Sequence, residues 1–119
     1  MNANELINKI KMHPDYAQVG MILCHNGVVR GTSRDGRKVS GLRVAVDNPR
    51  LAQVLDENRR LPGIVDIQVD IVADKDLQIG DDVMYLVVAG DIRDHVIDAL
   101  TRTLNAIKTS VTTKTEFFV

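Results

Sequence analysis

The cationic side chains of this sequence, among them Arg30, Arg93, Lys108 and Lys114, are the residue types that could hold anions. Arg93 falls in the first turn of a long predicted helix, where a positive charge is mildly unfavourable against the helix dipole, so its position hints at a partner anion. Lys108 falls at the other end of that helix. Lysine and arginine neutralise anionic substrates and stabilise negative charge that develops during a reaction.

Each of these positions also has a purely structural interpretation. Lys108 favours the C-terminal end of its helix, and Lys114 suits a solvated strand edge. Arg30 ends a predicted strand, where it is either a surface arginine or a guanidinium fork for phosphate oxygens. The neighbouring basic residues at 34, 37 and 38 crowd a turn and are interpreted as a solvated loop.

The histidines and the cysteine do not indicate a metal or cofactor site. His13, His25 and His95 have no ligand partner at metal-binding spacing, so each is interpreted as a structural or surface residue. Cys24 is the only cysteine and is expected to be a small buried hydrophobic residue. We expect no metal and no cofactor.

Composition narrows the class of protein. The 119 residues fit one domain, 1–119, and 15 basic against 16 acidic side chains give a net charge of -1, which argues against nucleic-acid binding. No stretch approaches the roughly 20 apolar residues that span a bilayer, so no membrane partner is expected. A single cysteine excludes an intrachain disulfide, and the simplest location is the cytoplasm.

Hydrophobic periodicity predicts an α+β domain with the order α-β-β-α-β-β-α-β, in which helices pack on an antiparallel or mixed sheet. The first two strands are expected to form a β-hairpin around the turn Ser33–Gly36. The long helix is expected to begin at Asp91 as its N-cap. The other predicted segments are helices at 4–10 and 49–61 and strands at 19–30, 38–46, 66–72, 83–89 and 110–119.

Several short motifs occur in a recognisable order. They are Gly27-Val-Val-Arg30, Leu77-Gln-Ile-Gly80-Asp81, Ile92-Arg93, Leu104-Asn-Ala-Ile-Lys108 and Thr113-Lys114-Thr-Glu116. In this order and spacing, the chain from about Val19 to Glu116 resembles the large, catalytic subunit of molybdopterin synthase, the MoaE-type family.

The resemblance implies a reaction and a set of partners. The reaction moves sulfur from the C-terminal thiocarboxylate of a small ubiquitin-like subunit, whose tail ends in Gly-Gly, onto the pterin phosphate substrate, cyclic pyranopterin monophosphate. By the same resemblance, Lys108 and Lys114 are the catalytic lysines and Arg30 binds the substrate's phosphate. Arg93 would reach into the neighbouring subunit's pocket, which implies a homodimer.

The sequence also departs from the family's pattern. Val72-Ala73-Asp74-Lys75 stands in place of a His-Arg-x-Gly segment, Ile92 in place of a histidine, and the tryptophan before the terminal lysine is missing. Two interpretations therefore remain open, a working sulfurtransferase subunit and a non-catalytic scaffold or partner-binding protein with a degenerate site. A small-ligand regulatory domain of similar topology is a third, resting on fold analogy alone.

Overall fold

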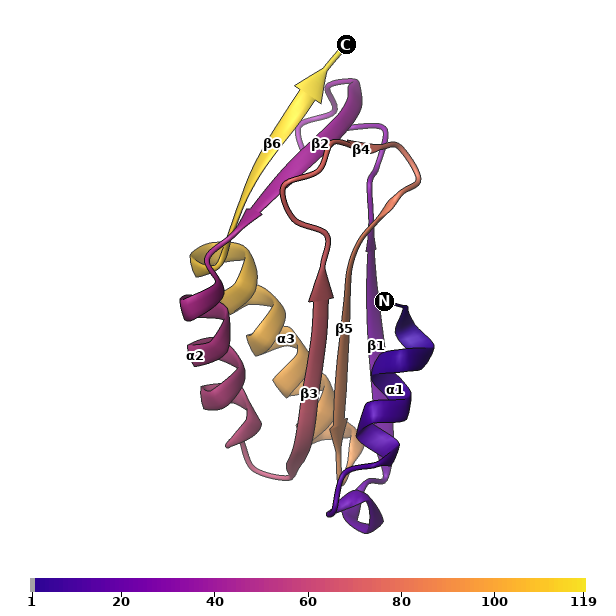
Figure 1. The fold of residues 1–119 in the computed structure, drawn as a ribbon, viewed down its shortest axis with the longest axis vertical. Coiled ribbons are helices and arrows are strands. Elements are labelled where there is room, and N and C mark those ends of the chain that lie inside the picture. Colours follow the sequence, from indigo (N-terminus) through magenta and orange to yellow (C-terminus); the bar gives the residue numbers. More distant parts are fainter. Residues whose placement is uncertain (1) are drawn as a thin grey trace.

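The computed structural model describes residues 2–119, which fold into an α+β domain of helices and antiparallel strands (Figure 1). In chain order the elements are α1 (Ala3–Lys11), a single 3₁₀ turn (Tyr16–Gln18), β1 (Met21–Val28), β2 (Val39–Val46), α2 (Asn48–Arg59), β3 (Ile64–Ile71), β4 (Leu77–Gln78), β5 (Asp82–Gly90), α3 (Arg93–Ser110) and β6 (Thr112–Phe118).

The first sheet has the order β1-β5-β3, with β5 paired antiparallel on both sides. Leu86 of β5 stands opposite His25 of β1 and Val69 of β3. Residues 86–90 are all buried. A strand paired at both edges and covered on both faces needs apolar side chains, and β5 confirms the strand predicted at 83–89.

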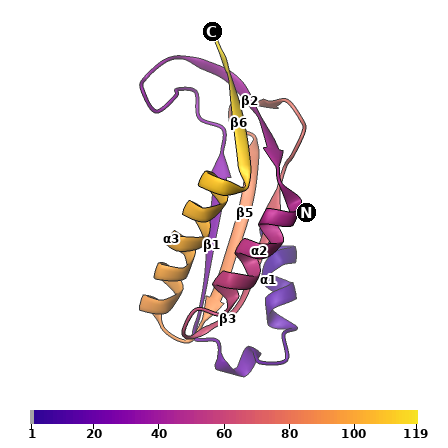
Figure 2. The same ribbon diagram turned by 90° about the vertical axis from the view of Figure 1, so that its left-hand side faces the viewer.

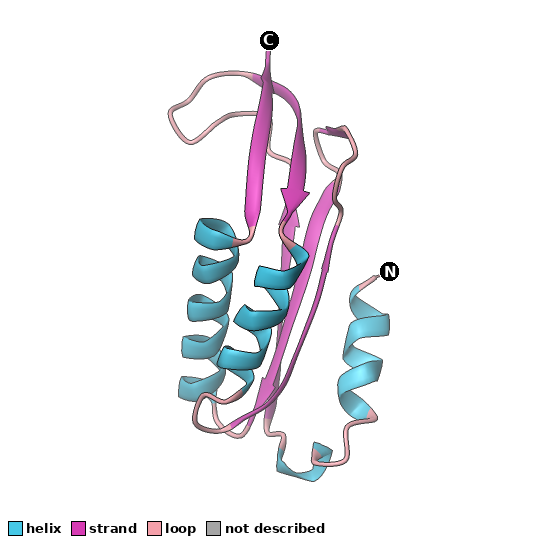
Figure 3. Cartoon of the chain, turned by 60° about the vertical axis from the view of Figure 1, so that its left-hand side comes forward, coloured by secondary structure: helices cyan, strands magenta, loops and turns pink. Residues whose placement is uncertain are grey.

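Helices cover the two faces of this sheet, α2 and α3 on one and α1 on the other (Figure 3). Successive side chains of a strand point to opposite faces, so Leu86 and Val88 pack with Ile107 of α3, while Val87 packs with Leu6 of α1. All five side chains have at most 1% of their surface exposed. Packing in this core therefore fixes the orientation of α3 against the sheet.

A second antiparallel sheet, β4-β2-β6, lies beyond the C-terminal end of α3 (Figures 1 and 2). β6 confirms the predicted final strand, and it pairs with β2 from Val46–Thr112 to Val39–Phe118. Val44 and Leu77 are buried in a separate small core between this sheet and the end of the first. The chain is consequently elongated, about 48 × 24 × 23 Å.

The predicted hairpin between the first two strands is wrong. β1 pairs with β5 and β2 pairs with β4 and β6, and the two strands' flanks meet only in a single bridge between Thr32 and Lys38. The chain leaving β1 is held by the turn before β5, because the Val29 amide donates to the Asp81 carbonyl and the Gly80 amide donates to the Val29 carbonyl. β4, in that turn region, was not predicted.

The start of α2 agrees with the prediction, and the start of α3 corrects it. Pro49 lies in the first turn of α2, as predicted, and Asp47 caps the helix by accepting from the Arg50 amide. α3 begins at Arg93 with Ile92 as its N-cap and no side-chain cap, so the prediction of Asp91 as N-cap is wrong. Asp91 instead accepts from the Ile92 amide and contacts the His95 ring, both at 2.7 Å.

We expect Leu86→Ala to destabilise the domain by about 2–5 kcal/mol, because it leaves a cavity between both neighbouring strands and the helices. Denaturant unfolding at a fixed protein concentration measures this. Met12→Ala is the matched control, since Met12 is 84% exposed and its truncation should change the free energy of unfolding by less than about 0.5 kcal/mol. Equal effects of the two substitutions would contradict the assignment of β5 as the centre of the core.

Candidate functional site

A cavity of about 580 Å³ opens where the two sheets meet the C-terminal end of α3. Its apolar lining comes from both sheets and from α3, through Leu42, Val44, Ile71, Val83, Met84 and Ile107. Its charged and titratable lining consists of His25, Arg30, Arg34, Lys108, Lys114 and Glu116. The cavity is thus lined by apolar side chains and by charged side chains that are mainly cationic.

Lys108 enters the cavity because of the helix that carries it. It lies in the last turn of α3, directly after Ile107, which is fully buried against the first sheet. The buried residue fixes the rotation of the helix, so its neighbour is presented to the second sheet. A cation in the last turn also interacts favourably with the helix dipole, so Lys108 stabilises the helix that carries it.

Lys114 reaches the same cavity from β6, where it stands opposite Val44 of β2. Its ammonium lies 3.9 Å from a carboxylate oxygen of Glu116, and the Glu116 side chain is only 23% exposed. Glu116 therefore neutralises part of the positive charge that Lys114 brings.

The basic segment after β1 contributes two arginines. Arg30 lines the cavity, and its Nε donates to the Thr32 carbonyl at 2.9 Å, which orients the guanidinium. Arg34 lines the cavity as well, although the sequence interpretation left it in a solvated loop. The sequence did not indicate this position, because a basic turn has the same composition whether it faces water or lies over a cavity.

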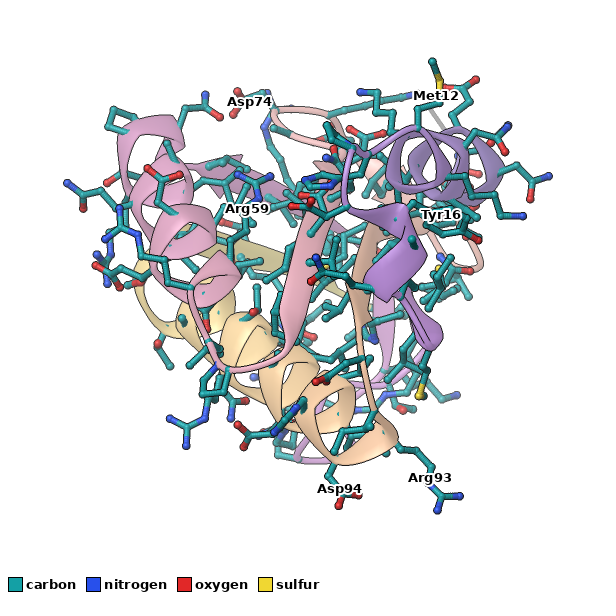
Figure 4. The ribbon with its side chains drawn as sticks, turned by 90° about the horizontal axis from the view of Figure 1, so that it is seen from below. Met12, Tyr16, Arg59, Asp74, Arg93 and Asp94 are labelled. Carbon is teal, nitrogen blue, oxygen red and sulfur yellow. The ribbon has the colours of Figure 1, made fainter. Side chains whose placement is uncertain are left out.

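Arg93 does not join the other three predicted residues. It begins α3 whereas Lys108 lies in its last turn, about 22 Å away along the axis at 1.5 Å per residue. Figure 4 shows its side chain directed outward from the end of the domain. Within one chain, therefore, the structure brings together Arg30, Lys108 and Lys114 but not Arg93.

His25 is the residue that sequence reasoning missed. It was expected to be structural or on the surface, yet it lines the cavity, and within residues 2–119 neither ring nitrogen has a hydrogen-bond partner. Burial, and then the positive charge of Lys108, lower the pKa of the His25 imidazole below its ordinary value. The ring is therefore mainly neutral at pH 7.

The neighbours of His25 in β1 lie on alternate faces of the strand. Cys24, one position earlier, points to the opposite face and is exposed, so the expectation of a buried thiol is wrong. Partial burial raises the pKa of the Cys24 thiol, which does not favour a nucleophile. Gly27, two positions later, shares His25's face, and a Cβ there would lie 3.5 Å from His25 Nε2. Its missing side chain leaves room beside the imidazole.

The arrangement suits the binding of anions. Four cationic groups and one carboxylate border a half-apolar hollow, in which charge-assisted hydrogen bonds are stronger than in bulk water. Among the described residues there is no group of three histidine, cysteine or acidic side chains that could hold a metal ion. None of the described helices is both long and apolar enough to cross a membrane.

Fold and site together define an α+β domain with a cationic cavity between its two sheets. The chain belongs to the MoaE protein family, whose model matches residues 1–110. No curated protein matches the chain closely.

Solved structures share the fold. Molybdopterin synthase from Staphylococcus aureus matches with a TM-score of 0.72 at 24% identity, covering 86% of this chain and 77% of that one. The MoaE protein from Burkholderia ambifaria matches with a TM-score of 0.76 at 18% identity, covering 100% of this chain and 82% of that one. A complex of subunits 1 and 2 of molybdopterin-converting factor from Helicobacter pylori matches with a TM-score of 0.70 at 15% identity, covering 100% and 84%.

We expect Lys108→Gln to raise the pKa of His25, because removing a nearby positive charge makes the protonated ring less unfavourable. Burial, the larger cause, remains, so the pKa should stay below about 6.5. NMR titration of the imidazole protons measures it. Lys114→Gln is the control, since Lys114 is paired with Glu116, and it should move the His25 pKa less. An unchanged pKa in Lys108→Gln would show that the two groups are not coupled.

Proposed function

We propose that this protein acts in molybdenum cofactor biosynthesis as a large subunit of molybdopterin synthase, a sulfurtransferase. It would transfer sulfur from the thiocarboxylated tail of a small ubiquitin-like partner ending in Gly-Gly to cyclic pyranopterin monophosphate. The observation that carries the proposal is the convergence of Arg30, Lys108 and Lys114 on one cavity, from three separate elements. We further propose that it works in the cytoplasm as one domain, 1–119, that forms a homodimer.

The chemistry requires this concentration of positive charge. A thiocarboxylate and a phosphate repel each other, so holding both in one cavity needs cations for each. Arg30, already oriented by its bond to the Thr32 carbonyl, offers a fork for phosphate oxygens. Lys108 lies near the C-terminal, negative end of the helix dipole. Its ammonium stabilises developing negative charge and donates a proton to a leaving oxygen.

A small-subunit partner is supported by one of the structural relatives. The Helicobacter pylori structure is a complex of two subunits of molybdopterin-converting factor. By analogy, this chain would take the place of the larger subunit.

A non-catalytic scaffold is the second candidate, and one observation favours it. Ile92 stands where the family's histidine is expected, and its side chain is 52% exposed beside Arg93. An apolar side chain there cannot donate a proton or a hydrogen bond to a substrate. The scaffold interpretation predicts partner binding without turnover.

We expect Lys108→Ala to lower the rate of sulfur transfer on the order of a hundredfold or more, as the loss of one preorganised charge-stabilising donor does. Stability should change by only about 0.3–1 kcal/mol, because the lysine's structural contribution is its interaction with the helix dipole. Lys108→Arg should not restore the full rate, since a guanidinium does not readily give up a proton. Assays with a thiocarboxylated Gly-Gly partner and thermal unfolding measure both quantities.

Lys9→Ala is the matched control, because Lys9 also lies in the last turn of a helix but outside the cavity. It should keep the wild-type rate. A wild-type rate in Lys108→Ala would remove Lys108 from the mechanism and favour the scaffold.

A complementation test addresses Arg93 and the homodimer together. If Arg93 serves the neighbour's cavity, Arg93→Ala and Lys108→Ala should each be impaired, yet an equal mixture should recover about a quarter of wild-type activity after subunit exchange. Half of the dimers are then mixed, and each mixed dimer holds one intact site. Sulfur-transfer rates of the separate and mixed variants measure this.

The control is a mixture of Lys108→Ala with Lys114→Ala. Both residues belong to the same chain's cavity, so neither site of the mixed dimer is intact and no recovery is expected. Recovery confined to the control, or absent from both mixtures, would contradict the shared site.

A further inference from the structure

When a thiocarboxylate gives up its sulfur, its acyl carbon needs an oxygen atom in place of that sulfur. When the thiocarboxylate sulfur displaces an oxygen from a carbon of the pterin's side chain, that carbon–oxygen bond breaks and the oxygen leaves with a proton from the Lys108 ammonium. The product is a thioester that joins the partner's tail to the pterin. The sulfur stays on the pterin only if the bond between it and the acyl carbon breaks, and an oxygen must then replace it. Water is the simplest source. This inference rests on the proposed function and concerns this second step.

Hydrolysis of a thioester by water is aided by a group that takes the water's proton, and few groups in the cavity can do so. Lysine and arginine side chains are donors without an acceptor site. The remaining titratable groups of the lining are His25 and Glu116. Glu116 is occupied by its ion pair with Lys114. His25 has no hydrogen-bond partner within residues 2–119.

The surroundings of His25 keep its ring available. It lies on the cavity face of β1, and the missing side chain of Gly27 leaves space beside its Nε2 atom. In the described part of the chain no hydrogen bond commits either nitrogen to a structural role, which is unusual for a partly buried histidine. Lys108 of α3 lines the same cavity, and its positive charge acts on the His25 ring.

We propose that His25 is the general base that activates the water molecule for hydrolysis of the thioester between the partner's tail and the pterin. One ring nitrogen accepts a proton from water while the water oxygen bonds to the acyl carbon. The bond from that carbon to sulfur then breaks, and the sulfur leaves as a thiolate beside the Lys108 ammonium. The imidazolium returns its proton to the thiolate, and the partner's tail is released as a carboxylic acid that ionises to solvent.

The charges around His25 favour its unprotonated form. Those that share the cavity are Lys108 from α3, Arg30 and Arg34 from the segment after β1, and Lys114 and Glu116 from β6, while the β5 residues in the lining, Val83 and Met84, are uncharged. Their sum is positive. The pKa of His25 is lowered by burial first and by Lys108 second, so the base form is present at neutral pH. The hydrolysis rate should rise with pH through a midpoint below about 6.5 and level off above it.

The test is a single-turnover reaction of the full chain with cyclic pyranopterin monophosphate and a thiocarboxylated Gly-Gly carrier from the same genome. Acid quenching and mass spectrometry follow both the thioester adduct and the released carrier. In His25→Gln the adduct should form at the wild-type rate and accumulate, its hydrolysis should slow on the order of a hundredfold or more, and the acidic limb of the pH profile should disappear. His13→Gln, a histidine in the turn after α1, should leave both steps unchanged.

A second variant guards against a purely structural effect. In His25→Ala, imidazole added to the solution should enter the space left by the ring and restore part of the hydrolysis rate. Hydrolysis at the wild-type rate in His25→Gln, or equal slowing of adduct formation and hydrolysis, would overturn the assignment of His25. No sulfur transfer by the wild-type chain would overturn the proposed function itself, and the role of His25 with it.

Discussion

Burial of β5 is the constraint on which the rest of the structure depends. The strand is paired at both edges and covered by α1 on one face and by α2 and α3 on the other. Because Leu86 and Val88 pack against the apolar stripe of α3, the helix can take only one rotation about its axis. That rotation decides which side chains at the C-terminal end of α3 reach the cavity, and Lys108 is one of them.

The site depends on the meeting of two separate sheets. β1 and β5 belong to the first sheet, whereas β2 and β6 pair beyond the end of α3 (Figure 1). The cavity lies where side chains of both sheets and of the end of α3 come together. Its rim consists of chain segments entering or leaving strands, where long cationic side chains are tolerated because their charged ends reach solvent.

Local patterns predicted most elements but not their partners. Three elements were predicted correctly from local pattern: β5 from its apolar run, α3 from its apolar stripe and β6 from its β-branched residues. The hairpin failed because periodicity shows that a segment is a strand without showing which strand it pairs with. Arg34 and His25 were missed for the same reason, since a cavity exists only once two distant sheets meet. The family resemblance supplied Arg30, Lys108 and Lys114, which the structure places in one cavity.

The positions of two side chains bear on whether the divergent site is a catalyst. Ile92 replaces the family's histidine at the start of α3, far from this chain's own cavity and next to Arg93. His25 brings an imidazole into the cavity itself, from β1 and beside Lys108. Within residues 2–119 His25 has no hydrogen-bond partner, and a partly buried polar group without one costs stability. The proposed reaction gives that imidazole a use, whereas a protein that only held a partner would gain nothing from it.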